Sequence, residues 1–270
     1  IRREIGVIRI NSKAGKKQPV FAAFIDGATA ELYGYLKNDM LLVDVVRTNQ
    51  EAFERIGMKR PDVRALLDMT RDDTDTWRMY AEGYTMGLNQ VEQEKTREKV
   101  MRYKPKNITE LAAFVAAVRP AFKSMLPIFL DRRHFDYGIP AFDKLIQTRE
   151  MTSSFLLYQE QTMKTLQFAG FSAPESYSAI KAIAKKRPEK VLPLKTRFLE
   201  GFAAKADMPS AEKVWQIIED ATSYGFNSSH AVCVALDSLY GAWLKAHHPL
   251  EYYTTLLSGY ADKGDKDRIS

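Results

Sequence analysis

The stretch SYGFNSSHAVCVALDSLYGAWLKAHHPLEYY, residues 223–253, carries the most informative local pattern in this sequence. A polar turn with Gly225 leads to a helix start at His230, and apolar residues then recur at helical spacing. A basic His-His-Pro end closes the pattern, because proline cannot continue a helix. The spacing therefore predicts an amphipathic helix over residues 231–247.

The composition is that of an ordinary globular protein. The 270 residues are 45% apolar and 27% charged, and they can bury a full core in one or two domains. The single cysteine, Cys233, excludes a disulfide framework and a cysteine-based zinc cluster, and its apolar surroundings predict a buried thiol. No apolar run approaches the ~20 residues that span a membrane. Since no signal peptide is present either, we expect a cytoplasmic protein without a membrane partner.

Apolar runs and turn residues predict a short β-rich start and a long helical body. Residues 19–25 and 35–46 have the character of strands, and the pattern becomes helical from Arg47 onward. Apolar faces at helical spacing in 108–118 and 208–221 extend this helical part. The predicted fold class is mainly α with a small α/β portion.

Basic residues are concentrated in one segment. The whole chain has a net charge of +6, and residues 181–197 contain seven basic side chains against one acidic side chain, Glu189. Such a cluster favours an anionic partner, although a solvated basic face is the alternative. A second cluster in 95–106 is diluted by glutamates and predicts an ordinary surface or at most a contact with a nucleic-acid backbone. The seven residues of the first cluster are Lys181, Lys185, Lys186, Arg187, Lys190, Lys195 and Arg197.

Five segments, in this order and at similar spacing, resemble the bacterial replicative DNA polymerase III alpha subunits, the C family of DNA polymerases. They are LKNDML at 36–41, the region 72–92 with its double aspartate, YQEQ at 158–161, IKAIAKKRPE at 180–189, and the segment 223–253 with YGFN and LKAH. The resemblance covers about residues 30–257. It implies that residues 1–46 are the end of the palm and that residues 47–270 form a multi-helix fingers domain.

The sequence departs from the family pattern at several basic positions. Ile180 stands where the family has the first of two arginines, and Ser228 stands where it has a lysine. The family's Arg-Pro-Gly-Pro is Arg119-Pro-Ala-Phe here. These changes identify the chain as a divergent member.

The resemblance implies a catalytic role for Asp39. It matches the third catalytic aspartate of the palm, so we expect it to bind Mg²⁺ in a two-metal site. The other reading is that Asp39 ends an exposed strand. The family's paired aspartates and its Gly-Ser triphosphate loop precede the matching region, so the fragment alone is expected to be inactive.

The resemblance also implies a nucleotide- and DNA-binding surface. Its basic loop is expected to face the triphosphate of the incoming nucleotide or the template backbone. Arg119 could add charge or cap the preceding helix, and His230 could bind phosphate or cap the next one. Gln159 is expected to be a buried polar brace. The expected binding residues are Lys181, Lys185, Lys186, Arg187, Arg119, Tyr158, Gln161, Tyr224, Asn227 and His230.

The implied function is template-directed DNA synthesis, with primer–template DNA and a deoxynucleoside triphosphate as partners and two Mg²⁺ ions as cofactors. A sliding clamp is expected to bind through parts outside this chain. Two other readings are a catalytically degenerate helical module that binds DNA, and a helical protein whose basic loop binds acidic partners. Salt-dependent DNA binding would separate these two readings.

Overall fold

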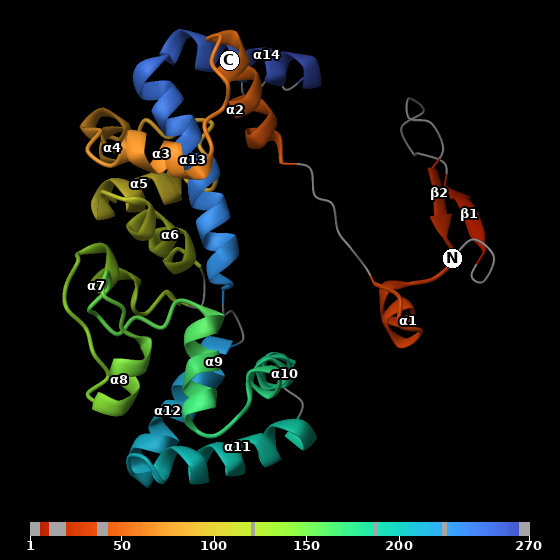
Figure 1. Ribbon diagram of the computed structural model, residues 1–270, viewed down its shortest axis with the longest axis vertical. Helices are drawn as coiled ribbons and strands as arrows, with labels where there is room; N and C mark the ends of the chain where they lie inside the picture. The colour runs from red at the N-terminus through yellow and green to blue at the C-terminus, as the bar shows by residue number, and fades with distance from the viewer. Residues whose placement is uncertain are drawn as a thin grey trace. The chain divides into compact units, whose positions relative to one another are not determined.

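In the computed structural model, residues 6–10, 20–36, 43–119, 122–185, 188–222 and 226–264 are described. The chain divides into two compact units, residues 1–43 and residues 44–270 (Figure 1). The division falls after Val43, close to the boundary after Val46 that the sequence predicted.

The first unit contains a two-stranded antiparallel sheet and one short helix. Strand β1 (Val7–Ile10) pairs with β2 (Val20–Ala23), and Val7 lies opposite Ala23. Strand β2 lies inside the segment 19–25, where the sequence predicted a strand. Helix α1 (Gly27–Leu32) follows, and the carboxylate of Asp26 accepts hydrogen bonds from the backbone N–H and hydroxyl of Thr29 at its start.

The second unit begins with helix α2 (Asp44–Arg55). The prediction of a strand over 35–46 is therefore wrong at its end, because residues 44–46 form the first turn of this helix. Asp44 places a carboxylate in that turn, where its negative charge interacts favourably with the positive end of the helix dipole. Ala52 and Phe53 are buried farther along, so helical spacing carries the apolar side chains of α2 into the core.

The first hydrophobic core surrounds the long helix α13 (Ser228–His247), which passes beside α4 (Thr74–Ala81) and α6 (Ile108–Ala117) (Figure 1). The predicted helix over 231–247 is confirmed and begins slightly earlier. Helix α6 is buried at every position from Leu111 to Ala117, so beyond its first turn it is enclosed on all sides and not only along the one apolar face that the sequence predicted. Besides α2, this core is formed by α3 (Val63–Thr70), α4 (Thr74–Ala81), α5 (Glu94–Tyr103), α6 (Ile108–Ala117), α7 (Leu126–Leu130), α13 (Ser228–His247) and α14 (Pro249–Lys263).

The second core lies farther along the same unit and is rich in aromatic side chains. Trp215 packs against Phe198, which stacks on Phe202, and all three are buried. Helix α11 (Pro188–Ala203) passes very close to the end of α9 (Gln159–Phe168), so a Cβ atom on Gly201 would clash with the carbonyl oxygen of Ala169. The helices of this core are α8 (Pro140–Ile146), α9 (Gln159–Phe168), α10 (Ala173–Ala184), α11 (Pro188–Ala203) and α12 (Met208–Thr222).

Cys233 lies on the solvent side of α13, so the prediction of a buried thiol is wrong. Ala231, Val234 and Ala235 face the core at this end of the helix. Cys233 and Val232 lie on the opposite side, where no other helix covers them in the described structure. None of the helices in the described ranges combines the length and the apolar character that crossing a membrane requires.

Candidate functional site

Four of the predicted site residues lie outside the described residues. These are Asp39, Lys186, Arg187 and Tyr224. The structure describes the remaining seven, and it gathers them in two places. One is an aromatic and arginine cluster at the start of α9, and the other is a basic cleft between α10 and α11.

The ring of Phe226 is the centre of the first cluster. The guanidinium of Arg119 lies 3.4 Å from the centroid of this ring, and the imidazole of His230 meets it edge-on at 5.0 Å. Tyr158 and Phe226 form a parallel bridge, in which the backbone N–H of Gln159 donates to the carbonyl of Phe226 at 2.9 Å. Phe226 was not among the predicted site residues, although it belongs to the YGFN motif that supplied Tyr224 and Asn227.

Arg119 keeps an unsatisfied donor in this cluster. Its Nε is buried and has no hydrogen-bond partner among the described residues, and burial lowers the pKa of its guanidinium. The C-terminal cap of α6 is Val118, and the side chain of Arg119 stacks on Phe226 instead of capping that helix. A partly desolvated cation with a free donor favours an anionic ligand, since burying an unpaired polar group is costly.

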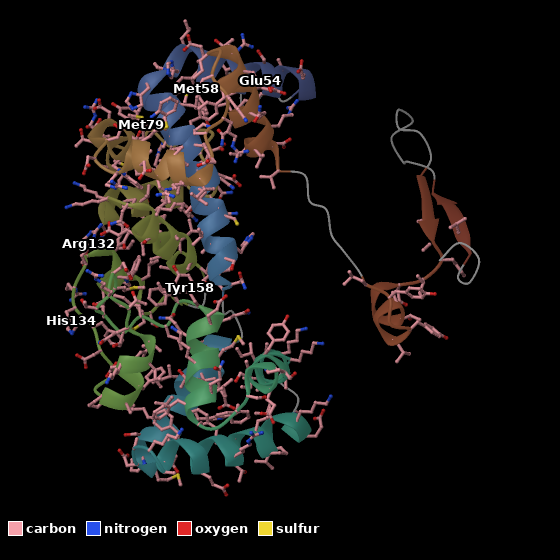
Figure 2. The ribbon with its side chains drawn as sticks, viewed as in Figure 1. Glu54, Met58, Met79, Arg132, His134 and Tyr158 are labelled. Carbon is pink, nitrogen blue, oxygen red and sulfur yellow. The ribbon has the colours of Figure 1, made fainter. Side chains whose placement is uncertain are left out.

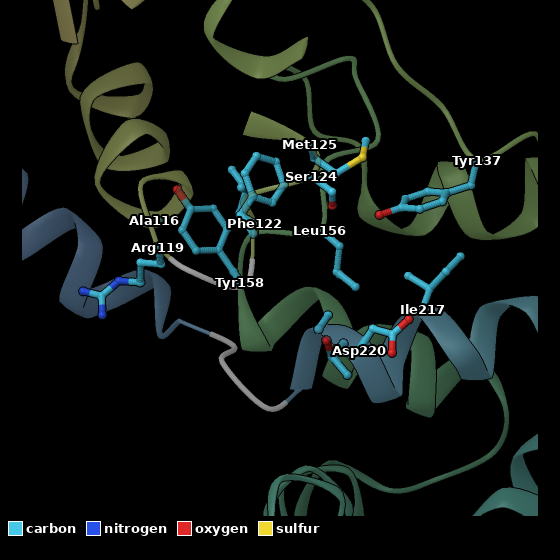
Figure 3. Close-up of a pocket in the computed structure, with 13 residues that line it drawn as sticks. Ala116, Arg119, Phe122, Ser124, Met125, Tyr137, Leu156, Tyr158, Ile217 and Asp220 are labelled. Carbon is cyan, nitrogen blue, oxygen red and sulfur yellow. The ribbon is translucent and has the colours of Figure 1, made fainter. Parts of the chain in front are cut away.

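A cavity of about 210 Å³ adjoins this cluster and lies between the two cores (Figure 3). Tyr158 lies at the start of α9 (Figure 2) and lines the cavity, with its hydroxyl directed toward Ala116. Burial raises the pKa of Tyr158 to about 12, so the phenol stays neutral and can donate a hydrogen bond at physiological pH. Arg119 and Asp220 also line the cavity and give it one cation and one carboxylate.

Gln161 is an internal brace. Its Oε1 accepts from the backbone N–H groups of Leu157 and Tyr158, both at 2.8 Å. Its Nε2 donates to the carbonyls of Ile146 and Phe155. Gln161 therefore plays the role that the sequence assigned to Gln159, which is only half-buried. Because these four bonds occupy its amide, we leave Gln161 out of the proposed binding surface.

The start of α13 is occupied by groups of the protein itself. Asn227, not His230, is the N-terminal cap: its side chain accepts from the backbone N–H of His230 at 3.0 Å. The backbone N–H of Ser228 donates to both carboxylate oxygens of Glu160, at 3.2 and 3.1 Å. A phosphate at this helix end would have to displace the Glu160 carboxylate or bind next to it and be repelled by its negative charge. The arrangement therefore disfavours an anion site here.

The second place is a cleft of about 500 Å³ between α10 and α11. Four of the seven clustered basic residues line it, namely Lys181, Lys185, Lys190 and Arg197. Of the described lining residues only Glu175 is acidic, and Arg197 binds it with contacts of 2.8 and 3.2 Å. The hydrogen bonds from Arg197 and Ser172 lower the pKa of Glu175 to about 2. Arg197 thus offsets the one carboxylate and leaves the lysines as net positive charge.

Lys181 and Lys185 form no ion pair within the described part of the chain. The ammonium of Lys181 lies 4.5 Å from the ring centroid of Tyr177, one helical turn earlier. Ile180, which stands in place of a family arginine, is 3% exposed and belongs to the second core. The Ile180 side chain packs in the second core, so of the two adjacent residues Ile180 and Lys181 only Lys181 lines the cleft. Arg119 and Lys181 line different cavities.

Other residues of the recognised segments hold the fold together. Asp73 caps α4 and accepts a 2.7 Å contact from His247 at the end of α13, which ties these two helices together. The Nζ of Lys245 donates to the carbonyls of Tyr84 and Met86 at 2.7 and 2.8 Å. Sequence reasoning could not assign these roles, because each pair of partners is far apart along the chain.

A sequence model of the bacterial DNA polymerase III alpha subunit finger domain matches residues 44–206. The chain belongs to this family. The match begins at the first residue of α2, where the second compact unit also begins.

Curated relatives agree with the family match. The chain is 30% identical to the DNA polymerase III subunit alpha of Campylobacter jejuni, over 97% of this chain and 23% of that relative. It is 35% identical to the subunit of Thermotoga maritima, over 80% of this chain and 25% of that relative. The Aquifex aeolicus subunit is 30% identical over 90% of this chain and 21% of its own length. The chain therefore spans about a quarter of these DNA polymerase III alpha subunits.

Proposed function

We propose that this chain is the palm end and fingers of a replicative DNA polymerase, and that the α10–α11 cleft binds phosphate groups of its substrates. The observation that carries the proposal is the gathering of Lys181, Lys185 and Lys190 in one cleft, with Arg197 holding the single acidic lining residue. Membership in the DNA polymerase III alpha family supports DNA and nucleotides as the substrates.

Fixed cations suit the chemistry of nucleotidyl transfer. The transition state of phosphoryl transfer is loose, so catalysis depends on positioning and on neutralising the charge of the phosphates. Lysines held on a helix can supply that charge without reorganising. Arg119, with its free buried donor beside the 210 Å³ cavity, is a second cationic contact for a nucleotide or a template strand. Lys186 and Arg187 are predicted to add to the cleft.

The cleft can be tested by charge reversal in the full-length polymerase. We expect Lys181→Glu combined with Lys185→Glu to raise the KM for nucleotide, or the Kd for primer–template, by roughly 10- to 100-fold, since charge-assisted contacts are lost. A raised KM with unchanged DNA affinity identifies a triphosphate site. A raised Kd with a flatter salt dependence identifies contacts with the template backbone.

The matched control is Lys59→Glu combined with Lys144→Glu, which changes the net charge equally at two exposed lysines outside the cleft. This control is expected to retain primer extension. Normal KM and Kd in the Lys181/Lys185 variant would contradict the proposal. Weakened DNA binding in that variant, with a wild-type chain that never extends a primer, would favour the catalytically degenerate DNA-binding module.

Mg²⁺ is proposed as the cofactor, with Asp39 as the ligand that this chain contributes. Among the described residues, no group of three or more His, Cys, Asp or Glu side chains could hold a metal ion. The described part therefore does not form a metal site by itself, and we derive no catalytic step through the metal. Carboxylates outside the described residues would complete the site, and a sliding clamp would bind through other parts of the polymerase.

Asp39→Ala tests this assignment in the full-length polymerase. We expect primer extension to fall by at least about 100-fold, because a lost carboxylate weakens metal binding and its neutralising charge. Asp44→Asn is the control, since Asp44 is the first residue of α2 and an amide preserves a polar side chain in that first turn. Undiminished extension by Asp39→Ala would refute the role of Asp39.

A further inference from the structure

The solvent-facing side of α10 carries an aromatic ring directly beside the basic cleft. Tyr177 is 49% exposed, so about half of its side chain surface is open to a ligand. Lys181 and Lys185 follow at four-residue intervals and are exposed as well, so all three lie on one face of the helix. The Lys181 ammonium lies 4.5 Å from the ring centroid of Tyr177.

Several contacts hold this face in place. Ser176 and Ala179, on the buried side of α10, are enclosed by the second core, as is Ile180. A capping box at Ser172 and Glu175 fixes the start of the helix. Tyr177 therefore projects from a rigid helix, and Lys181 can add a cation–π contact that restricts its ring. A ring that is ordered in advance loses little conformational entropy when a ligand covers it.

The chemistry of this face matches a single nucleic-acid strand. Proteins bind single strands by combining a positively charged groove for phosphates with exposed aromatic rings on which bases stack. A free triphosphate would use the lysines alone and would give no reason for an exposed ring. An acidic protein segment would likewise use the three lysines alone and would leave the exposed ring of Tyr177 without a stacking partner.

We propose that the Tyr177–Lys181–Lys185 face binds the single-stranded template, with one base stacked on Tyr177 and adjacent phosphates at the two lysines. This inference rests on the proposed function of the cleft and adds the identity of the strand that occupies it. Tyr177 acts as a positioning residue for the unpaired template and takes no part in bond formation.

The test uses the full-length polymerase and two primer–template duplexes. One has a template overhang of ordinary nucleotides, and the other has the same number of abasic nucleotides, which keep the phosphates but offer no base to stack. We expect Tyr177→Ala to weaken binding of the ordinary overhang by roughly 5- to 100-fold and to leave the abasic overhang unchanged. Tyr177→Phe should stay within about twofold of wild type, because phenylalanine retains the stacking face.

Tyr84→Ala is the matched control, since Tyr84 is 53% exposed and lies outside the cleft. The Lys181→Glu and Lys185→Glu variant should weaken both overhangs, because both keep their phosphates. If this lysine variant weakens both overhangs while Tyr177→Ala binds both like wild type, the inference fails and the proposed function stands. If the lysine variant also binds nucleotide and both overhangs normally, the proposed function of the cleft fails as well.

Discussion

Lys245 illustrates how a single buried charge can organise a loop. Its side chain is 4% exposed, and its Nζ is bound by two backbone carbonyls of the segment between α4 and α5. Tyr252 donates to the carbonyl of Gly87 in the same segment. Burial lowers the pKa of Lys245 to about 8, while the charge of Glu92 opposes that shift. The ammonium thus provides hydrogen bonds to the loop carbonyls, but burial makes its charged form costly.

This pKa predicts a pH dependence of stability. In the unfolded chain Lys245 returns to an ordinary pKa near 10.4, so between about pH 8 and pH 10 the unfolded state binds more protons than the folded state. We expect the free energy of unfolding to rise with pH in this window, by at most about 1.4 kcal/mol per pH unit from this group. Urea unfolding at pH 7.5, 8.5 and 9.5, followed by circular dichroism, measures the slope.

Lys245→Met provides the comparison, because it removes the titrating group and keeps a long apolar stem. As the pH rises from about 8, the free energy of unfolding of the wild type should increase relative to that of the variant. Parallel pH profiles of the two proteins would show that Lys245 does not titrate in this window.

At the scale of elements, the contact between α9 and α11 depends on one missing side chain. The backbone of α11 at Gly201 lies against the carbonyl of Ala169, where α9 ends, with no space for a methyl group. This close approach lets Phe198 and Phe202, on the same helix, reach the second core. Glycine in a helix is normally unfavourable, so here the packing outweighs the propensity.

Gly201→Ala is expected to destabilise the protein by about 1–3 kcal/mol, because the added Cβ must push backbone against backbone. Gly259→Ala in α14 is the matched control: its nearest contact would be the guanidinium of Arg47 at 3.5 Å, an ordinary distance. That control should be neutral or stabilising by up to about 1 kcal/mol from helix propensity. Gly201→Ala should therefore lower the thermal unfolding temperature while Gly259→Ala leaves it unchanged or raises it, and a stabilised Gly201→Ala would contradict the close contact.

At the scale of the whole molecule, periodic patterns predicted the helices well, because a helix places every third or fourth side chain on one face. They predicted the mainly helical fold class and the helix that became α13. They failed where tertiary partners decide burial. Cys233 is exposed because α13 faces the core with its other side.

The candidate site was predictable only in part. The basic cluster in the sequence indicated the α10–α11 cleft, since residues 181–190 are close along the chain. The stacking of Arg119 on Phe226 joins segments more than a hundred residues apart, and no local pattern reveals such a pair. The acidic contact of Glu160 with the start of α13 was missed for the same reason. Long-range partners thus determine which motif residues remain free to bind a ligand.

The exposed thiol of Cys233 has a practical consequence. It is the single cysteine of this sequence, and it lies on the first turns of α13, shortly after the turn that contains Phe226 and His230. A maleimide fluorophore attached there would lie on the helix that follows the aromatic cluster. In a stopped-flow instrument, a change in its emission would report the binding of nucleotide or template in real time.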